Sequence, residues 1–570
     1  MLSDKPVVRN VVEICAAKGI EYVVIAPGSR NAPLIISFNE HGAFKCLSIP
    51  DERVAGYFAL GIAQQTRKPV IITCTSGTAS LNFAPAIAEA FYQKIPLLII
   101  TADRPVEWIH QGEGQSINQR GVFSNYVKRS YQLPQEAKDK DGLWSTNRMV
   151  SEAIDATYLE GGGPVHINIP FQEPLYGQKD YTDIPPPKVV TRLAFEKVLA
   201  NNTLQDLGEV WDKANKKMIL CGLLPLNKEL QELIRNLEQD TNIIVLSETT
   251  SNIVTANSIN QIDAVLSTIT DSELNQFQPD LLITIGGSFI SKKIKHFLRK
   301  NTPNQHWHIE DNSEYIDTFQ SLTTAILISP ISFFKQFSTF FSQKSSYPHS
   351  YQHSYQELWL NRKKKVIKHH QQYLAKIPWC DLKAFELILL SIPKKTNLHL
   401  ANSTPVRYAQ LFKADTVISY NSNRGVAGID GSTSTAAGAA FVNNKLTLLV
   451  TGDISFFYDS NAFWHHHLSS NLRVILINNG GGNIFRYIPG PPTTHQLDTY
   501  FEAQHQLNAK HIAKTFNLAY SFAANEADLK EILLTFFEPQ SDNRAAILEI
   551  KTPNEESAAV LRGYFRKTDS

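Results

Sequence analysis

The sequence has no excess of charge of either sign. Its 570 residues include 55 lysines and arginines and 54 aspartates and glutamates, which gives a formal net charge of +1. A chain so close to neutral has no overall field that would attract nucleic acid or an anionic membrane. We therefore expect no nucleic-acid partner, and any function that depends on charge must rest on a local cluster.

Cysteine motifs and long apolar runs are also missing. The five cysteines are odd in number and show no CxxC spacing, which excludes a disulfide framework or a cysteine zinc site and favours a reducing compartment. No apolar run approaches the roughly 18 residues of a membrane helix. The N-terminus carries the acidic Asp4 and shows no signal peptide. We expect a cytoplasmic protein without a membrane segment. The cysteines are Cys15, Cys46, Cys74, Cys221 and Cys380.

The chain does have length and a recurring α/β pattern. A chain of 570 residues is too long to fold around one hydrophobic core, so we expect about three or four domains. Short runs rich in valine, isoleucine and leucine recur between longer helical patterns, as is typical of parallel strands that are buried on both faces. The predicted strands lie at 22–26, 70–74, 97–101, 165–169, 218–221, 243–246, 281–285, 325–328, 416–420, 446–450, 474–477 and 546–550.

Two polar, irregular stretches divide this pattern. The first, 178–188, ends in three prolines, which cannot continue a helix or a central strand. The second, 343–353, is rich in serine, histidine and tyrosine. We predict an α/β protein of three tandem doubly wound parallel-sheet domains. Their predicted ranges are 1–182, 190–342 and 375–570.

Two local clusters are interpreted as structural. Residues 359–373 are predicted to form a helix with a solvated basic face, because a nucleic-acid patch needs more basic residues and interleaved aromatics. The run His465-His466-His467, if helical, would point its side chains about 100° apart, so they cannot share one metal ion. We expect these histidines to be exposed or packed.

Two polar residues follow two strong strands in the last third of the chain. The predicted strand 446–450 runs into Asp453, and the strand 474–477 runs into Asn479 and a glycine run. One strand–helix–strand unit separates the two residues, so a right-handed crossover places both at the carboxyl edges of nearby parallel strands, where α/β proteins bind ligands. A carboxylate and an amide oxygen suit Mg²⁺, which typically shares its shell with phosphates. The glycines allow close approach, so the carbonyl of Gly481 is a candidate third ligand.

Simpler alternatives exist for each of these features. Gly452 and Asp453 taken alone fit an ordinary turn, and the glycines fit a flexible loop. In the first third, Glu52 opens a helical pattern, where it fits equally well as the acidic complement of a helix N-terminus. The pairing of Asp453 with Asn479 at this spacing favours metal–diphosphate binding over the turn.

With these residues the sequence resembles the thiamine-diphosphate-dependent enzymes, which share Gly-Asp, a strand–helix–strand interval and Asn-Asn. This chain reads Gly-Asp-Ile where many members have Gly-Asp-Gly. The resemblance implies that thiamine diphosphate is held through Mg²⁺ or Mn²⁺ by Asp453, Asn479 and Gly481. It also implies that Glu52 hydrogen-bonds the pyrimidine ring and so promotes the tautomer that activates the cofactor.

Longer strings narrow the resemblance to the 2-succinyl-5-enolpyruvyl-6-hydroxy-3-cyclohexene-1-carboxylate synthases, the MenD family of menaquinone biosynthesis. The match covers both outer thirds and is poor in the middle third. It implies that 2-oxoglutarate is decarboxylated and that the resulting succinyl-semialdehyde carbanion is added to isochorismate in a 1,4-addition. The strings lie at 26–31, 75–79, 101–105, 171–176, 401–403, 422–425, 428–431 and 434–438.

Several arginines follow predicted strands, where side chains project into a cleft. Guanidinium groups offer bidentate donors, so such a group suits substrates with several carboxylates, although each arginine fits a structural salt bridge as well. The resemblance places Ser29, Arg30 and Gln115 with Glu52 at the reacting centre. It assigns substrate binding to Arg30, Arg104, Lys293, Asn402, Ser403, Arg407 and Arg424. It assigns cofactor contacts to Ser403, Ile429, Ile454, Ser455, Ile484 and Phe485 as well as to the metal site.

Two of these assignments, Ile429 and Lys293, depend on the shape or the charge of the side chain. Ile429 matches the apolar residue that wedges between the cofactor rings. Lys293 stands where the family often has arginine, so it lacks the bidentate fork. The resemblance further implies that Glu52 and Asp453 meet across a subunit interface, in a homodimer or homotetramer.

Two other functions stay open. One is a related carboligase or 2-oxoacid decarboxylase, several of which bind a flavin or nucleotide in the middle domain; the middle third shows no GxGxxG fingerprint. The other is a non-catalytic scaffold on the same fold, which the presence together of Glu52, Asp453 and Asn479 argues against.

Overall fold

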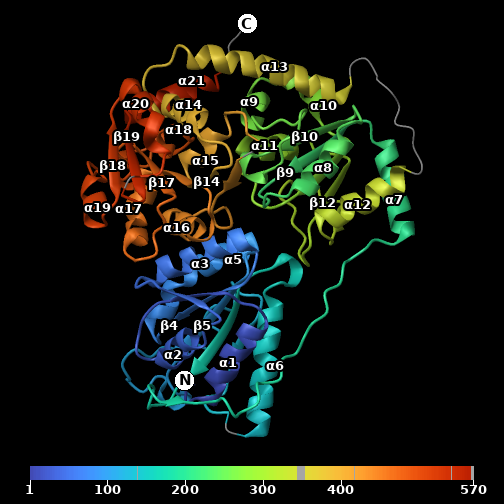
Figure 1. The fold of residues 1–570 in the computed structure, drawn as a ribbon. Coiled ribbons are helices and arrows are strands. Elements are labelled where there is room, and N and C mark those ends of the chain that lie inside the picture. Colours follow the sequence, from blue (N-terminus) through green and yellow to red (C-terminus); the bar gives the residue numbers. More distant parts are fainter. Residues whose placement is uncertain (138, 343–353, 416–417, 541, 567–570) are drawn as a thin grey trace.

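Three parallel β-sheets flanked by helices make up the chain (Figure 1). The computed structural model describes all residues except 138, 343–353, 416–417, 541 and 567–570. We refer to the three sheets with their helices as the N-terminal, middle and C-terminal units. In Figure 1 the N-terminal unit lies below the other two, with the C-terminal unit in orange and red on the left and the middle unit in green on the right.

The N-terminal sheet has the strand order β3-β2-β4-β5-β7-β6, and all its pairings are parallel. Alternate residues of its strands face opposite layers, because successive side chains of a strand point to opposite faces. Val23, Ile71 and Leu98 pack with α1 and α6, whereas Val24, Ile72 and Ile99 pack with α3, α5 and part of the C-terminal unit. The bounds are β2 Tyr22–Ile25, β3 Lys45–Ser48, β4 Val70–Cys74, β5 Leu97–Asp103, β6 Ser130–Gln132, β7 Val165–Pro170, α1 Pro6–Ala17, α2 Ala32–Glu40, α3 Glu52–Thr66, α4 Thr78–Asn82, α5 Ala84–Gln93 and α6 Lys140–Ala156.

The middle sheet has the order β10-β9-β11-β12-β13 and is parallel throughout. An extended connection, 180–200, leads into it without helix or strand. The bounds are β9 Lys217–Cys221, β10 Ile243–Ser247, β11 Leu281–Ile285, β12 Gln305–Ile309, β13 Thr324–Ile326, α7 Asn201–Lys213, α8 Lys228–Leu237, α9 Ile262–Ser267, α10 Leu274–Phe277, α11 Lys292–Lys300 and α12 Pro330–Ser342.

The C-terminal sheet has the order β15-β14-β16-β17-β19-β18, again parallel. The chain leaves β14 toward β15 on one side and reaches β16 on the other, which makes the β14–β16 boundary a topological switch point. The bounds are β14 Asn397–Leu400, β15 Ser419–Asn421, β16 Thr447–Gly452, β17 Leu472–Asn478, β18 Ala519–Ala523, β19 Ala546–Lys551, α14 Asp381–Ser391, α15 Thr404–Ala409, α16 Ser432–Val442, α17 Asp453–Tyr458, α18 Ile484–Tyr487, α19 Lys510–Thr515, α20 Glu526–Phe536 and α21 Asn554–Tyr564.

Helices join the units. Between the N-terminal and C-terminal units, α3 packs against α16 so closely that a Cβ on Gly438 would lie 2.0 Å from the carbonyl oxygen of Phe58. Along the top of Figure 1, α13, Tyr355–Leu374, spans the middle and C-terminal units. Its Lys363 ammonium donates to the carbonyl of Ser258 at 2.7 Å, and its Tyr373 hydroxyl donates to the carbonyl of Val560 at 2.7 Å.

The predicted fold class is confirmed, and most predicted strands are present at or near their predicted positions. The strand predicted at 325–328 is Thr324–Ile326, and the one at 416–420 is Ser419–Asn421, with 416–417 outside the described residues. Short or polar strands were missed, namely β3, β6, β12, β14 and β18 of the three sheets and the two-residue strands β1 and β8. In β12, for example, His306 and His308 are buried, and the Thr284 hydroxyl forms hydrogen bonds with both rings. A hydrophobicity pattern does not identify a strand whose buried residues are polar.

Two structural expectations are corrected. The helix at 359–373 exists within α13, but its basic run is not simply solvated, because Arg362 pairs with Glu273 of the middle unit. The three histidines are not helical, because they form a turn after the 3-10 helix η5, Ser460–Phe463; His465 packs edge-on against Phe58 with ring centroids 5.1 Å apart.

The two stretches expected to divide the chain have different outcomes. Within 178–188, the short strand β8, Gln178–Lys179, pairs with β1, Leu2–Ser3, and the stretch 343–353 lies outside the described residues. The predicted domain ranges stay predictions. Among the described residues, no helix has the length and apolar character of a membrane span.

Candidate active site

Asp453 and Asn479 lie at one edge of the C-terminal sheet, after two neighbouring strands. β16 and β17 pair in parallel, with Gly452 beside Ile477, and Asp453 and Asn479 come directly after these strands. This is the neighbourhood that a right-handed crossover predicts. The edge adjoins the switch point between β14 and β16, where α/β proteins form their ligand crevice.

The Asp453 carboxylate is buried and fixes the glycine run. Its Oδ2 accepts hydrogen bonds from the N–H groups of Gly480 at 2.8 Å and Gly481 at 2.9 Å, and its Oδ1 accepts one from the N–H of Ile454 at 2.7 Å. The carbonyl of Gly481 accepts from the N–H of Asn483 at 2.9 Å. The structure therefore brings the three predicted metal ligands to one place.

The Asn479 amide is held at one end only. Its Nδ2 donates to Asp381 Oδ2 at 3.0 Å, while its Oδ1 is buried and has no hydrogen-bond partner among the described residues. A buried acceptor without a donor costs about 1–3 kcal/mol, so this oxygen fits a ligand position for a cation. The described residues contain no group of three or more His, Cys, Asp or Glu side chains that suits a metal ion. A Mg²⁺ ion here would take Asp453, Asn479 and phosphate oxygens, which is the usual shell of this ion.

A second loop reaches the same edge from β15. Asn402, which follows β14, donates through Nδ2 to the carbonyls of Asn423 and Gly428, both at 2.6 Å, and accepts from Arg424 Nη1 at 2.8 Å. Arg424 is buried, and burial together with neighbouring Arg407 lowers its pKa. Asn402 thus positions Arg424 instead of presenting a free amide to a ligand.

Ser403 and Arg407 form a compact pair beside this loop. Ser403 has a φ of +71°, a conformation that is strained for serine and that often marks functional sites. Its carbonyl accepts from Arg407 Nη1 at 2.5 Å. The Arg407 charge also acts on the middle unit, where it opposes the burial that raises the pKa of the Asp263 carboxyl group.

Apolar and hydroxyl groups line the edge between these loops. The Ser455 hydroxyl donates to the carbonyl of Ile429 at 2.9 Å and so ties α17 to the 422–431 loop. Ile429 and Ile454 are half-buried, as are Ile484 and Phe485 of α18. The predicted cofactor contacts therefore lie on segments that meet at one sheet edge.

The N-terminal unit carries its own arginine group. Arg30 is buried and donates to the carbonyl of Phe171 at 2.9 Å and to Glu173 Oε1 at 3.1 Å. Arg104 donates to the carbonyl of Gly114 at 2.8 Å and lies 3.9 Å from the same Glu173. Burial and the adjacent Arg104 charge lower the pKa of Arg30. Glu113 Oε1 also lies 3.5 Å from Arg104 Nη1, so two guanidiniums and the two exposed carboxylates of Glu113 and Glu173 form one cluster here.

Ser29 and Gln115 flank this group. Ser29 precedes Arg30 at the end of β2, and the backbone of Gln115 accepts from the Ser76 hydroxyl at 2.9 Å. Gln115 has a φ of +55°, and a Cβ on Gly77 would lie 3.2 Å from its backbone, so the turn depends on that glycine. The Gln115 side chain is exposed.

The middle unit presents two lysines from α11. Lys293 donates to the Ser267 hydroxyl at 2.6 Å and lies over the Phe565 ring at 4.3 Å. Lys295 makes no hydrogen bond or ion pair within the described residues, and its pKa is lowered by burial and by the Arg424 and Arg407 charges despite the opposing Glu248 carboxylate. Burial raises the pKa of Glu248 to about 7. Lys295, Arg407 and Arg424 thus form a second basic group.

The two basic groups belong to different parts of the molecule. Within the described residues, no hydrogen bond or ion pair links Arg30 and Arg104 to the group of Arg407, Arg424 and Lys295. The structure therefore groups the predicted substrate residues into two sets and does not bring them all to one point.

Glu52 begins α3, the helix that docks on the C-terminal unit. Its neighbours contact that unit directly: Asp51 Oδ2 accepts from Asn461 Nδ2 at 2.8 Å, and Arg53 Nη2 donates to the carbonyl of Tyr458 at 2.9 Å. Glu52 is half-buried, and burial raises the pKa of its carboxyl group. The contact between the two units occurs here within one chain, so the expected subunit interface stays a prediction.

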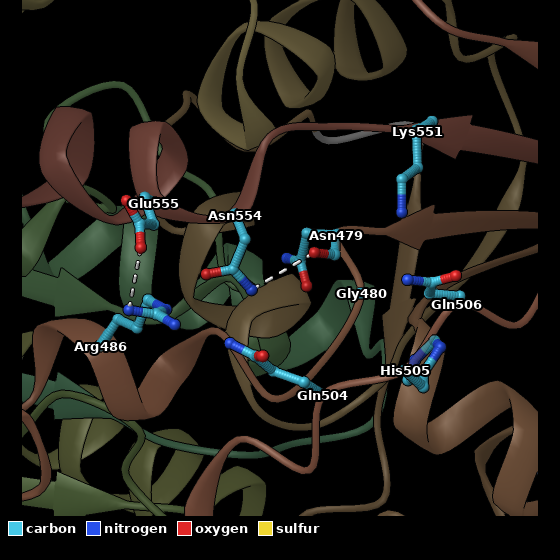
Figure 2. Close-up of a pocket in the computed structure, with 9 residues that line it drawn as sticks. All are labelled: Asn479, Gly480, Arg486, Gln504, His505, Gln506, Lys551, Asn554 and Glu555. Atoms are coloured by element: carbon cyan, nitrogen blue, oxygen red, sulfur yellow. Dashed lines mark hydrogen bonds and ion pairs between the residues drawn. The ribbon is translucent and has the colours of Figure 1, made fainter. Parts of the chain in front are cut away.

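A cavity of about 530 Å³ opens beside Asn479 and Gly480 (Figure 2). In Figure 2, Asn479 lies in the wall between Asn554 and Gly480, and the Asn479 carbonyl accepts from Asn554 Nδ2 at 3.3 Å. His505 lines the cavity, with Nε2 3.4 Å from Asp453 Oδ2. The wall is polar throughout and consists of Asn479, Gly480, Arg486, Gln504, His505, Gln506, Lys551, Asn554 and Glu555.

Sequence reasoning missed four residues that support this site. Asp381 precedes it by nearly a hundred positions and bonds Asn479, Glu89 of α5 bonds the 422–431 loop, Lys295 joins the basic group, and His505 approaches Asp453. None lies in a recognisable motif, because each acts through a contact between distant segments. Only the strong basic character of α11 gives a local signal, which Lys295 shares with Lys293.

Comparison with known proteins agrees with this geometry. A family model described as the N-terminal TPP binding domain of thiamine pyrophosphate enzymes matches residues 6–122, and one described as the middle domain of thiamine pyrophosphate enzymes matches 196–383. The chain is 44% identical to the 2-succinyl-5-enolpyruvyl-6-hydroxy-3-cyclohexene-1-carboxylate synthase of Flavobacterium psychrophilum, over 98% of both chains. It is 41% identical to the synthase of the same name from Flavobacterium johnsoniae, over 98% of both chains, and 41% identical to that of Porphyromonas gingivalis, over 99% of this chain and 97% of the relative.

Proposed function

This chain belongs to the 2-succinyl-5-enolpyruvyl-6-hydroxy-3-cyclohexene-1-carboxylate synthase (MenD) family of thiamine-diphosphate enzymes, and from that premise we propose that it catalyses the family reaction in menaquinone biosynthesis. In this transferase reaction, 2-oxoglutarate loses its C1 carboxyl group as CO₂. The former C2 then bonds to the ring alkene of isochorismate, and the neighbouring ring carbon takes up a proton. The relatives' printed name describes the product of this addition.

The observation that carries the proposal is the unsatisfied Asn479 Oδ1 beside the Asp453 carboxylate. The two groups follow adjacent strands at a switch point and present hard oxygen ligands, and no lysine or arginine of the described residues forms an ion pair with Asp453. Mg²⁺ or Mn²⁺ with the diphosphate of the cofactor satisfies both, because these ions take oxygen ligands and bridge phosphates.

Thiamine diphosphate supplies, when bound, a nucleophilic carbon that adds to 2-oxo acids and then accepts the electrons released by decarboxylation. The chain's part is to hold and activate it. Asp453, Asn479 and the Gly481 carbonyl hold the metal; Ser403, Ile454 and Ser455 contact the diphosphate end, and Ile429, Ile484 and Phe485 the rings. Glu52 hydrogen-bonds the pyrimidine, and burial raises the pKa of its carboxyl group.

The two basic groups suit substrates with two carboxylates each. Arg30 and Arg104, with Ser29 and Gln115, form one set, and Arg407, Arg424 and Lys295, with Ser403, form the other. Asn402 positions Arg424, and Lys293 adjoins the second set through the Asp263 carboxyl group, whose pKa burial raises and the Lys293 and Arg407 charges lower. Both sets contain guanidinium groups that are buried or half-buried, and a buried guanidinium binds a carboxylate strongly because little water competes.

We also propose the coarser organisation implied by the family. The N-terminal unit, 1–182, binds the pyrimidine end and the C-terminal unit, 375–570, binds the diphosphate end, with 190–342 between them. A homodimer or homotetramer and a cytoplasmic location accord with the family and with five free cysteines.

The test is a coupled assay with the purified chain, thiamine diphosphate, Mg²⁺, 2-oxoglutarate and isochorismate. We expect CO₂ release and a product with the mass of the adduct, and no adduct when pyruvate replaces 2-oxoglutarate. Turnover of pyruvate at a similar rate, or a flavin absorption spectrum of the purified protein, would instead support a related carboligase. The absence of both CO₂ and adduct would rule the proposal out.

A further inference from the structure

Asp381, at the first position of α14, is a buried carboxylate that forms no ion pair with any of the residues that the structure describes. It is fully buried, and its side chain accepts three hydrogen bonds, all from neutral groups. Oδ1 accepts from the hydroxyls of Thr552 at 2.6 Å and Ser557 at 3.2 Å, and Oδ2 accepts from Asn479 Nδ2 at 3.0 Å. Thr552 follows β19 and Ser557 lies in α21, so Asp381 collects donors from three segments around the end of β17.

A buried charge with no counter-charge is costly and calls for a physical explanation. Fold stability alone does not require a carboxylate here, because a neutral amide or hydroxyl would accept from Thr552 and Ser557 as well. The distinctive property of a carboxylate is that it accepts at both oxygens and donates at neither. That property bears on Asn479, the one contact that reaches the proposed metal site.

The two ends of an asparagine amide have nearly the same shape, and a half-turn of the terminal torsion exchanges them. Only the oxygen end ligates a cation. An acceptor-only group beside Asn479 requires the Nδ2 end on its own side, and this leaves Oδ1 on the opposite side, where it is buried and without a partner among the described residues. The backbone is fixed separately, because the Asn479 carbonyl accepts from Asn554 Nδ2 (Figure 2).

We propose that Asp381 is a positioning residue for the metal site: it selects the Asn479 amide orientation that presents Oδ1 to the cation of the thiamine-diphosphate complex. The inference rests on the proposed function for the identity of that complex. Asp381 acts through Asn479, because its Oδ1 accepts from Thr552 and Ser557 and its Oδ2 accepts from Asn479 Nδ2.

The discriminating variant is Asp381→Asn. An asparagine at 381 keeps the size of the side chain but offers an N–H₂ group, which bonds equally well to an Asn479 oxygen turned toward it. Both amide orientations of Asn479 then become accessible. Groups that orient metal ligands typically contribute about 10- to 100-fold to metal affinity. We expect D381N to lose Mg²⁺ affinity by about that factor, in the presence of saturating thiamine diphosphate.

Thr552→Val is the matched control. It removes a donor to Asp381 Oδ1 at 2.6 Å but leaves the bond between Oδ2 and Asn479. We expect its melting temperature to fall while its Mg²⁺ affinity stays within about threefold of the wild type, since the positioning contact itself remains. A purely structural role for Asp381 predicts instead that both variants lose stability and metal affinity in parallel.

Isothermal titration of Mg²⁺ into each full-length protein with thiamine diphosphate gives the affinities, and thermal unfolding without metal gives the stability. Equal Mg²⁺ affinity of wild type and a folded D381N would overturn the inference. Should D381N not fold, a crystal structure of the wild type with both ligands decides. Asn479 Oδ1 on the metal with Nδ2 still on Asp381 supports the inference, and an amide turned away from Asp381 overturns it. Failure of the wild type to bind thiamine diphosphate would instead contradict the proposed function.

Discussion

At the scale of single residues, the site is defined by atoms that lack a partner. Asn479 Oδ1 is one, and the Nε atoms of Arg30, Arg104 and Arg424 are others, all buried and without a hydrogen-bond partner among the described residues. A folded chain normally satisfies such groups. Other buried groups, such as the indole N–H groups of Trp307 and Trp359, also lack a partner, but at these four predicted ligand-binding residues a bound ligand would complete the bonding.

Glu52 illustrates how far sequence reasoning reaches at this scale. Its position at the start of a helix followed from the pattern after it, and α3 begins at this residue. Its surroundings did not follow, because they depend on Tyr458 and Asn461, some four hundred positions later. Motifs predict residue identity and strand ends, whereas the contacts between distant segments require the fold.

The Glu52→Gln variant tests the role of this carboxyl group. We expect turnover to fall at least about 100-fold, in the range typical for loss of a proton-transfer group. Cofactor binding, measured by isothermal titration, should persist, because the proposed metal ligands lie on the C-terminal unit. Glu21→Gln, which removes an exposed ion pair with Lys45, is the control and should keep full activity. Unchanged turnover in E52Q would remove Glu52 from the mechanism.

Buried histidines predict the response to acid. His166 in β7 is fully buried between Thr101 and Ser130, and burial lowers its pKa to about 3. Since the unfolded chain has a histidine pKa near 6.5, the neutral ring contributes stability above about pH 6.5, and that contribution is lost as the pH falls toward 3. By pH 5 the loss amounts to about 2 kcal/mol.

Denaturant unfolding of the wild type and His166→Gln at pH 7.5 and 5.0 measures this effect. The glutamine does not titrate, so the disadvantage of H166Q relative to the wild type should be about 2 kcal/mol smaller at pH 5.0 than at pH 7.5. An equal difference at both pH values would show that the ring is not held neutral.

At the scale of elements, the loop between β15 and α16 of the C-terminal unit carries site residues and is held by the N-terminal unit. It carries Arg424 and Ile429, and Glu89 of α5 holds it: Oε1 accepts from the N–H of Gly425 at 2.6 Å and Oε2 from the N–H of Val426 at 2.7 Å. The sequence predicted both the strand before this loop and the residues on it. It gave no sign of Glu89, which resembles any other residue of an amphipathic helix.

Glu89→Gln tests this anchor. A glutamine has one acceptor and one donor end, so one of the two loop N–H groups loses its partner at a cost of about 1–3 kcal/mol. We expect the KM for the substrates to rise about tenfold or more with a smaller change in kcat, as Arg424 becomes less well placed. Gln93→Leu is the control, because the Gln93 side chain donates to Glu89 and only the Gln93 backbone, which the substitution keeps, adjoins Gly425 of the loop. Identical KM values in E89Q and the wild type would mean that the loop holds its position without this carboxylate.

At the scale of the whole molecule, the three sheets could be predicted from the sequence, but the way the three units pack against one another could not. Buried, unalternating strands reveal a parallel layer wherever valine and isoleucine dominate, as in Val70–Cys74. The contacts between the units are made by small or polar residues instead. A Cβ on Gly61 would lie 2.1 Å from the carbonyl of Thr435, so α3 and α16 approach closely at Gly61 and Gly438. A hydrophobicity pattern does not predict such a contact.

Gly438→Ala tests that joint. In an unhindered helix this change stabilises by about 1 kcal/mol, so the sign of the effect is diagnostic. Here the new Cβ meets the Phe58 backbone, and we expect a net loss of about 1–3 kcal/mol and a lower melting temperature. Gly287→Ala, whose Cβ would meet nothing within 4 Å, is the control. A G438A protein as stable as the wild type would show that the two helices separate at little cost.

The fate of labelled carbon tests the central claim most directly. 2-Oxoglutarate labelled with ¹³C at C1 or at C2 is incubated with isochorismate, Mg²⁺, thiamine diphosphate and the protein, and the products are followed by ¹³C NMR. The account predicts that the C1 label leaves as CO₂ and bicarbonate, while the C2 label becomes a ketone carbon bonded to the cyclohexene ring. A C2 label that appears only in free succinic semialdehyde, or a C1 label retained in the product, would contradict it.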